Sequence, residues 1–364
     1  MEKTKVIVAM SGGVDSSVAA LLMKKKGYEV FGVFMKNWSD SKNEFGECSW
    51  KDERNMAIKV CSLLQIPLIT LDSEKAYRKE VIAKMFSDYK NGITPNPDID
   101  CNKKIKFPLL LKAAKKIGAD FLVTGHYSKI KKLDKKFELF RGKDESKDQS
   151  YFLYALKQNE LKSLLFPVGD YSKKEIREIA RKSNFPNWGK KSTVGICFVG
   201  KVNLKKFLQK RIKPKKGKIL NPEGKVIGKH DGIYYYTIGQ RIGSRYGIEV
   251  SKYSDDKSFV KRWYIAKKDA KKNILIAAPK EHPLNFRKEI FIKNTHWISE
   301  KPKNNSNILA RIRQVGELLQ CKIIFKKNKI QIILNESITG ISEGQAIVLY
   351  KGKKVLGGGE IGFS

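Results

Sequence analysis

Seven residues near the start of the chain have the composition of a phosphate-binding loop. The string Ser11-Gly12-Gly13-Val14-Asp15-Ser16-Ser17 directly follows the apolar run Val6 to Met10, and apolar residues then recur at helical spacing. Glycines let a backbone approach a ligand closely, and the free N–H groups at a helix start favour phosphate. Asp15 could hold Mg²⁺, and the serine hydroxyls could donate to phosphate oxygens. A plain glycine turn with serine and aspartate caps fits the spacing equally well, but the complete string after a strand favours a nucleotide.

No second nucleotide signature fits the sequence. The Gly-x4-Gly-Lys-Ser/Thr pattern of kinases and GTPases does not occur. The string Gly357 to Gly362 matches the dinucleotide-binding pattern, but only two residues follow it, which leaves no room for the helix that binds pyrophosphate. We therefore interpret it as a coincidental match.

The cysteines are candidates for thiol chemistry rather than for disulfides or metal binding. They are five in number and widely scattered, which fits a reducing compartment: Cys48, Cys61, Cys101, Cys197 and Cys321. With four histidines and no Cys-x-x-Cys pair, we expect no zinc or iron–sulfur site. Cys101 precedes a predicted helix that contains three lysines, and a helix N-terminus and cations both lower a thiol pKa. Without a family to compare, Cys101 could equally be incidental and Cys197 a core residue.

The charge balance points to a polyanionic partner. Lys and Arg number 74 and Asp and Glu 37, so the formal net charge is +37. Such a surplus favours nucleic acid, because neutralising phosphates releases condensed counterions. A genome-wide codon bias towards lysine is the alternative. No apolar stretch is long enough to span a membrane, and the N-terminal apolar run is too short for a secretory signal, so we expect a cytoplasmic protein without membrane contacts.

The periodicity predicts an α/β domain followed by two β-rich domains. Apolar runs alternate with helical spacings through Phe121 to Thr124, which predicts a doubly wound parallel sheet with ligands beyond the carboxyl ends of its strands. A hairpin is predicted between Lys129 and Arg141. After about residue 205, short β-type runs such as Tyr234 to Ile238 suggest small sandwiches or barrels. We place the catalytic α/β domain at 1–208, a small central β-rich domain at 209–283 and a C-terminal β-barrel at 284–364.

The loop and four further segments resemble a known family. Ser11 to Ser17 looks like the signature of N-type ATP pyrophosphatases, which cleave ATP to AMP and pyrophosphate. The chain is more narrowly similar to the tRNA-specific 2-thiouridylases, the MnmA family. The segments that carry this similarity are Phe34-Met35-Lys36-Asn37-Trp38, Asn96-Pro97-Asp98-Ile99-Asp100-Cys101-Asn102, Thr124-Gly125-His126-Tyr127 and Gly195-Ile196-Cys197-Phe198.

The resemblance implies an ATP-dependent tRNA-uridine 2-sulfurtransferase. Such an enzyme adenylylates O2 of the wobble uridine and replaces that oxygen with sulfur, giving 2-thiouridine, AMP and pyrophosphate. The resemblance further implies that Cys197 carries a persulfide and that Asp98 is a general acid or base. Cys101 would release the sulfur from this persulfide or resolve the linkage between Cys197 and the base. A transient disulfide between the two cysteines would then need reduction. The implied cofactors are ATP, Mg²⁺ and a persulfide sulfur loaded by a cysteine desulfurase or relay protein.

The resemblance also implies the residues that hold the nucleotide and the tRNA. The nucleotide contacts are Ala9, Met10, Ser11, Gly12, Gly13, Val14, Asp15, Ser16, Met35 and Gly125. The contacts to the tRNA anticodon stem-loop are Asn96, Pro97, Asp98, His126, Lys147, Asp148, Gln149, Arg311, Ile312 and Gln345. On residue type alone, Asp98 could be a turn-forming aspartate and His126 a structural histidine.

The sequence departs from the family pattern at a few positions. Lys191 stands where members usually have an acidic residue, and Ile312 replaces a frequent aromatic. These differences bear on local tRNA contacts more than on the chemistry.

Two other functions are compatible with the glycine-rich loop and the basic charge. An amidating synthetase for a small molecule would keep the loop without needing the cysteines, and a basic RNA-binding protein would use the glycines only structurally.

Overall fold

Val6, Ile7 and Val8 form the middle of a parallel sheet, because an apolar β-branched run suits a strand that is covered on both faces. The computed structural model describes residues 3–39, 49–191, 203–243, 249–250, 262–327 and 329–363. The sheet has the order β3-β2-β1-β4-β7, and all neighbouring strands run parallel. Its strands are β1 (Lys5–Ala9), β2 (Glu29–Lys36), β3 (Leu68–Asp72), β4 (Phe121–Val123) and β7 (Leu164–Leu165). The predicted doubly wound domain is confirmed.

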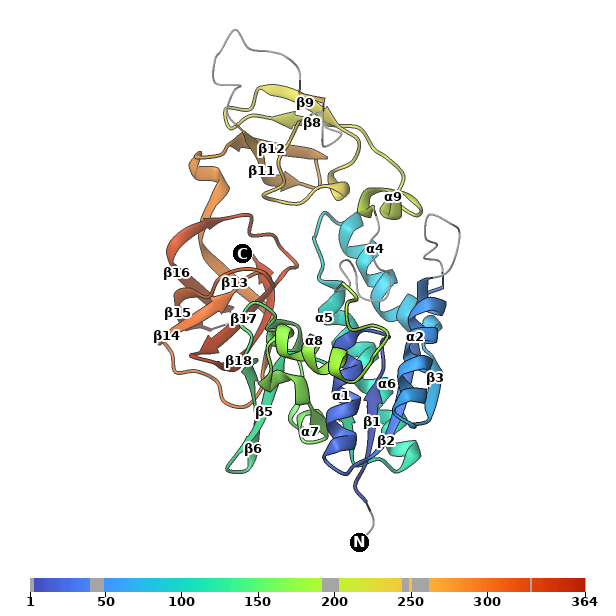
Figure 1. Ribbon diagram of the computed structural model, residues 1–364. Coiled ribbons are helices and arrows are strands. Elements are labelled where there is room, and N and C mark those ends of the chain that lie inside the picture. The colour runs from blue at the N-terminus through green and yellow to red at the C-terminus, as the bar shows by residue number, and fades with distance from the viewer. Residues whose placement is uncertain are drawn as a thin grey trace.

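Helices pack against both faces of this sheet (Figure 1). Val6 and Val8 share an apolar cluster with Val18 of α1, whereas Ile7 shares another with Leu110 of α6, because side chains of a strand alternate between faces. The helices are α1 (Val14–Lys25), α2 (Ser49–Leu63), α3 (Glu74–Tyr77), η1 (Arg78–Ile82), α4 (Ala83–Lys90), α5 (Pro97–Cys101), η2 (Asn102–Lys106), α6 (Phe107–Ile117), η3 (Ser150–Leu153), α7 (Gln158–Leu161), η4 (Pro167–Asp170), α8 (Lys173–Lys182) and α9 (Leu204–Gln209). Within the described ranges, none is long and apolar enough to cross a membrane.

A small mostly antiparallel sheet follows the α/β domain, and a short 3-10 helix, η5 (Ile233–Tyr235), lies beside it. The strands of this sheet are β8 (Gly217–Leu220), β9 (Val226–His230), β10 (Glu249–Val250), β11 (Trp263–Asp269) and β12 (Ile274–Pro279). Their order across the sheet is β10-β9-β8-β12-β11. The β-type run predicted at Tyr234 to Ile238 is wrong, because these residues form η5 and a turn. The hydroxyls of Tyr234 and Tyr235 donate to the carbonyls of Lys213 and Ile212, more than 20 residues away, and that of Tyr236 donates to Asp231 Oδ1. These bonds override the strand preference of aromatic residues.

The C-terminal strands close into a six-stranded barrel, preceded by a 3-10 turn, η8 (Pro283–Asn285). Its strands are β13 (Phe286–Trp297), β14 (Asn307–Arg311), β15 (Leu319–Lys326), β16 (Lys329–Thr339), β17 (Ala346–Lys351) and β18 (Lys354–Gly362), and β13 pairs with β18 to close the ring. The Gly357 to Gly362 string lies in β18, as expected for a coincidental match to the dinucleotide pattern. A Cβ on Gly357 would lie 2.1 Å from the carbonyl oxygen of His296, so the close strand approach requires glycine.

The predicted hairpin joins the α/β domain to the barrel. It consists of β5 (Ser128–Leu133) and β6 (Lys136–Arg141), and β6 pairs with β18 at Phe140 and Lys354. Figure 1 shows the barrel beside the α/β domain, with the hairpin descending between them and the small sheet above both. The α/β domain therefore has the barrel as a neighbour, joined to it through this hairpin.

Candidate functional site

The glycine-rich loop connects β1 to α1, as the sequence predicts. Gly12 has φ of +72°, a conformation that other residues rarely adopt, and a Cβ there would lie 2.3 Å from the carbonyl oxygen of Glu53. Gly13 is the N-cap of α1 and supplies no side-chain cap, so the helix start remains suited to an anion. Ala9 and Met35 lie at the carboxyl ends of β1 and β2, where parallel sheets bind ligands.

The serine hydroxyls of the loop have different environments. Those of Ser16 and Ser17 are buried and each donates to the carbonyl of Gly13 at 3.0 Å, which stabilises the loop from inside. Ser11 is exposed, with its Oγ 3.2 Å from that of Ser16. Of these three serines, Ser11 is therefore the one whose hydroxyl faces solvent.

Asp15 is neutralised by a lysine that the sequence analysis did not identify. The Nζ of Lys173, at the start of α8, lies 2.6 and 2.7 Å from the two carboxylate oxygens of Asp15, and the hydroxyl of Tyr127 donates to Oδ1 at 2.7 Å. Burial, together with the Asp15 charge, raises the pKa of Tyr127, so its hydroxyl stays protonated as a donor. Ser172 and Glu175 form a capping box at the start of α8, a local signal that does not indicate the position of this helix beside the loop.

The segment after β4 packs directly on the phosphate loop. A Cβ on Gly125 would lie 2.8 Å from backbone atoms of both Asp15 and Ser16, so this glycine permits the contact. The ring of His126 packs against those of Phe107 and Phe166, with centroid distances of 5.7 and 5.8 Å. Burial lowers the pKa of His126 well below its usual value, with a smaller effect from the nearby Lys106, so the ring is neutral at pH 7.

The segment that carries Asp98 and Cys101 begins a helix earlier than predicted. Asn96 accepts a hydrogen bond from the backbone N–H of Ile99 at 3.4 Å and Pro97 is the first residue of α5, both favourable features of a helix start. Cys101 is consequently the last residue of α5 rather than a residue before the helix, and it is 0% exposed. Asp98 is half-buried. The predicted lowering of the Cys101 pKa stays a prediction.

The other cysteines differ in what the structure describes. Cys197 and its motif neighbours Gly195, Ile196 and Phe198 lie outside the described residues, as does Cys48. Burial raises the pKa of Cys61 to about 11 and that of Cys321 to about 12, so neither is a thiolate at neutral pH. Cys101 is the one described cysteine that lies in a predicted site.

Known proteins and protein families match this chain over nearly its whole length. Three family models match in succession: "tRNA methyl transferase HUP domain" over residues 4–201, "tRNA methyl transferase PRC-barrel domain" over 205–279 and "Aminomethyltransferase beta-barrel domain" over 287–361. The chain is similar to the "tRNA-specific 2-thiouridylase MnmA" of Bacillus cytotoxicus, with 39% identity over 99% of this chain and 95% of that protein. It is 41% identical to the protein of the same name from Alkaliphilus oremlandii, over 98% and 97% of the two chains.

The chain belongs to the tRNA-specific 2-thiouridylase family. The domain models mention methyl transfer, but the relatives that match from end to end are named for thiolation, so the family is named after them. Among solved structures, a 4-thiouridine synthetase in complex with RNA and ATP is 16% identical over 54% of this chain and 46% of that chain, with a TM-score of 0.35. A likeness of that size carries no argument about function.

Most of the predicted tRNA contacts of this 2-thiouridylase family member lie where the α/β domain meets the barrel. Asp148 accepts from Arg141 Nε at 3.2 Å and from Arg311 Nη1 at 2.8 Å, and all three side chains are buried. Ile312 is also buried, whereas Lys147 is exposed. Their contact with tRNA stays a prediction, and in this conformation the buried ones hold the domains together.

Gln149 connects this junction to the phosphate loop. Its side-chain oxygen accepts a hydrogen bond from the backbone N–H of Tyr127 at 3.1 Å, and the backbone N–H of Gln149 donates to the Tyr127 carbonyl at 3.0 Å. Tyr127 in turn donates to Asp15. A residue predicted to contact tRNA therefore orients a side chain of the nucleotide loop.

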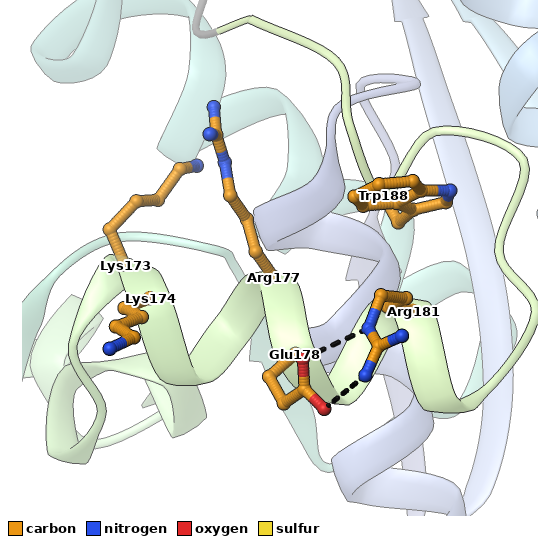
Figure 2. Close-up of a pocket in the computed structure, with 6 residues that line it drawn as sticks. All are labelled: Lys173, Lys174, Arg177, Glu178, Arg181 and Trp188. Carbon is orange, nitrogen blue, oxygen red and sulfur yellow. Dashed lines mark hydrogen bonds and ion pairs between the residues drawn. The ribbon is translucent and has the colours of Figure 1, made fainter.

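A cationic pocket on α8 adjoins the phosphate loop (Figure 2). It is lined by Lys173, Lys174, Arg177, Glu178, Arg181 and Trp188. Lys173 and Arg177 extend from α8 in the same direction, whereas Arg181 pairs with Glu178 at 2.9 Å. The buried Nε of Arg177 has no hydrogen-bond partner among the described residues. Sequence reasoning missed both Lys173 and Arg177, because they are brought to the loop only by the packing of α8 on α1.

Proposed function

We propose that this chain is a tRNA-uridine 2-sulfurtransferase that uses ATP to replace O2 of the wobble uridine with sulfur. The observation that carries the proposal is the similarity to relatives of that name, which extends over nearly the whole chain. The phosphate loop and the cationic α8 residues beside it support the use of a nucleotide. The wobble base is single-stranded in its loop, so an enzyme can splay it into a pocket at modest cost.

The chemistry explains why a nucleotide loop belongs in such an enzyme. A pyrimidine C2 carbonyl is a poor electrophile, and its oxygen is a poor leaving group. ATP, when bound, supplies the adenylyl group that converts this oxygen into a leaving group. The chain's own contribution is to hold the phosphates at the start of α1 and to place the base beside Asp98, which we propose as its general acid or base.

The residues at the loop fit a triphosphate, since Gly13 begins α1 without a side-chain cap and leaves the helix start suited to an anion. We propose the nucleotide contacts named above: Ala9, Met10, Ser11, Gly12, Gly13, Val14, Asp15, Ser16, Met35 and Gly125. Lys173 and Arg177 would add positive charge for the phosphates. Asp15 would ligate Mg²⁺ once Lys173 turns to phosphate, because its carboxylate is otherwise fully paired with that lysine.

The sulfur step uses two thiols in the proposal. The terminal sulfur of a persulfide on Cys197 forms the bond to C2, and AMP leaves with the former O2. In one order of events, Cys101 then attacks Cys197 Sγ, which breaks the bond from Cys197 to the transferred sulfur and frees 2-thiouridine. In the other order, Cys101 attacks Cys197 Sγ of the persulfide first, and the sulfide that this releases attacks C2. Either order leaves a disulfide between the two cysteines, which takes two electrons from external thiols. Because Cys101 is fully buried in the described conformation, this step requires α5 or its cover to move.

The partners and domain limits complete the proposal. We propose that tRNA binds through its anticodon stem-loop, that a cysteine desulfurase or relay protein loads the sulfur, and that the protein acts in the cytoplasm. Asn96, Pro97, Asp98 and His126 would face the base, and Lys147 the RNA backbone. The proposed domains are 1–208, 209–283 and 284–364. This division is supported by three separate family models, which match residues 4–201, 205–279 and 287–361.

The experiment is mass analysis of nucleosides from an unmodified tRNA. The tRNA is incubated with the protein, ATP, Mg²⁺, cysteine and a cysteine desulfurase, then digested. We expect 2-thiouridine in proportion to the AMP formed. AMP formation without any thionucleoside would point to a small-molecule synthetase, and the absence of both products would point to a binding protein; either result would refute the proposal.

A further inference from the structure

Gln345 lies where the barrel touches the segment that leads into α5. Its Nε2 is 2.9 Å from the carbonyl oxygen of Thr94 and 2.8 Å from that of Pro95, so the side-chain amide donates to two consecutive carbonyls. These carbonyls directly precede Asn96, the N-cap of α5. A single barrel side chain thus fixes the backbone at the point where the predicted catalytic segment begins.

The backbone around Gln345 fits closely against the same segment. The N–H of Thr94 donates to the carbonyl of Glu343 at 3.1 Å. Gly344 has φ of +83°, and a Cβ there would lie 2.3 Å from Cγ2 of Ile93 and 3.0 Å from the Thr94 oxygen. The turn 343–345 therefore leaves no space for a different path of residues 93–95 while Gln345 stays bonded to them.

An ion-pair group adds a second connection between the barrel and α5. Lys84 Nζ lies 3.2 Å from Asp100 Oδ2 in α5, 2.8 Å from Asp88 Oδ2 and 3.9 Å from Glu360 Oε1 in β18. The start of α5 is held by Gln345 and its end by this group. Because α5 is only five residues long, fixing both ends sets the orientation of the whole element.

We infer that Gln345 is a positioning residue for sulfur transfer, acting on Asp98 and Cys101 through the 94–96 segment rather than by binding tRNA. An amide NH₂ group has two donors, and the two carbonyls of this segment take both. Neither donor is left for RNA in this conformation. The inference rests on the proposed function, because Asp98 and Cys101 are catalytic only under it.

The test compares Gln345→Ala and Gln345→Glu with a matched control. Glutamate has the same size but cannot donate to the carbonyls, so both variants lose the two hydrogen bonds to Thr94 and Pro95. Gln331→Ala is the control, since Gln331 is a buried barrel glutamine that donates to Glu289 away from this junction. Three quantities are measured in each full-length protein: the Kd for unmodified tRNA, the single-turnover rate of 2-thiouridine formation at saturating tRNA, and the rate at which iodoacetamide alkylates Cys101.

The positioning role predicts a split between binding and rate. In both Gln345 variants, the thiolation rate at saturation falls at least tenfold, Cys101 alkylation speeds up at least threefold, and the tRNA Kd stays within twofold of wild type. A Kd raised tenfold with an unchanged rate at saturation would show a direct tRNA contact and overturn the inference, as would wild-type values of all three quantities. If the unaltered protein forms no 2-thiouridine, the proposed function fails. Unchanged Cys101 alkylation in the Gln345 variants would separately refute the positioning role of Gln345.

Discussion

Arg311 of the barrel and Asp148 of the α/β domain form an ion pair with an N–O distance of 2.8 Å, and their side chains are only 5% and 0% exposed. Asp148 is followed by Gln149, which holds Tyr127, and Tyr127 donates to Asp15 in the phosphate loop. A continuous series of contacts therefore runs from the barrel to the proposed nucleotide site. The junction between the domains is part of what shapes that site.

Removing Arg311 should destabilise the protein. Arg311→Ala leaves Asp148 buried with Arg141 as its one cationic partner among the described residues, and breaking a buried pair costs about 3 kcal/mol. We expect a loss of this size in the free energy of unfolding, measured by urea titration. Lys136→Ala is the control, because Lys136 pairs with Glu300 at an exposed position and should matter little. Equal stability of the two variants would contradict a structural role for the buried pair.

Lys173 should be required for ATP turnover. Lys173→Met removes the cation nearest the loop, and loss of one preorganised charge at a phosphoryl site lowers rates by roughly 10²-fold. Pyrophosphate release at saturating ATP and tRNA measures the effect. Lys174→Met changes the exposed neighbour that lines the same pocket and should leave the rate nearly unchanged. If Lys173→Met turns over at the wild-type rate, the lysine only balances the charge of Asp15.

The cap of α8 should make stability depend on pH. Glu175 accepts from the N–H of Ser172 at 2.6 Å and from Lys143 at 2.9 Å, and these bonds, the backbone one foremost, lower its pKa to about 2. A carboxyl pKa depressed by folding adds stability above the unfolded value near ~4.3, and this stability is lost as the pH falls towards 2. The stability difference between wild type and Glu175→Gln should therefore be larger at pH 7 than at pH 3.

Urea titrations at both pH values measure this difference. Glu223→Gln, at an exposed turn residue, provides the control and should show no comparable change with pH. A difference for Glu175→Gln that is the same at pH 3 as at pH 7 would be inconsistent with a capping carboxylate that stays ionised in the folded protein.

The sequence predicted the local parts of the site well. The strand, loop and helix around Gly12 follow from an apolar run, glycines and helical spacing, all of which are local signals. The start of α5 before Cys101 was not predicted, although Asn96 and Pro97 are ordinary helix-start residues, because Asn and Pro are equally common in turns.

The parts that could not be predicted depend on contacts between distant residues. Lys173 meets Asp15 across 158 positions of sequence, and Gln345 meets Pro95 across 250. Neither pairing leaves a trace in composition or periodicity. Likewise, a buried aspartate such as Asp148 looks like any loop aspartate until the barrel supplies Arg311.

The most direct test of the account is sulfur incorporation by Cys101→Ser and Cys197→Ser, with pyrophosphate release measured in the same reactions. The account predicts that both variants still bind tRNA and release pyrophosphate in forming the adenylylated base, because the proposed nucleotide loop is intact, but that 2-thiouridine becomes undetectable in each. Full 2-thiouridine formation by both serine variants would contradict it.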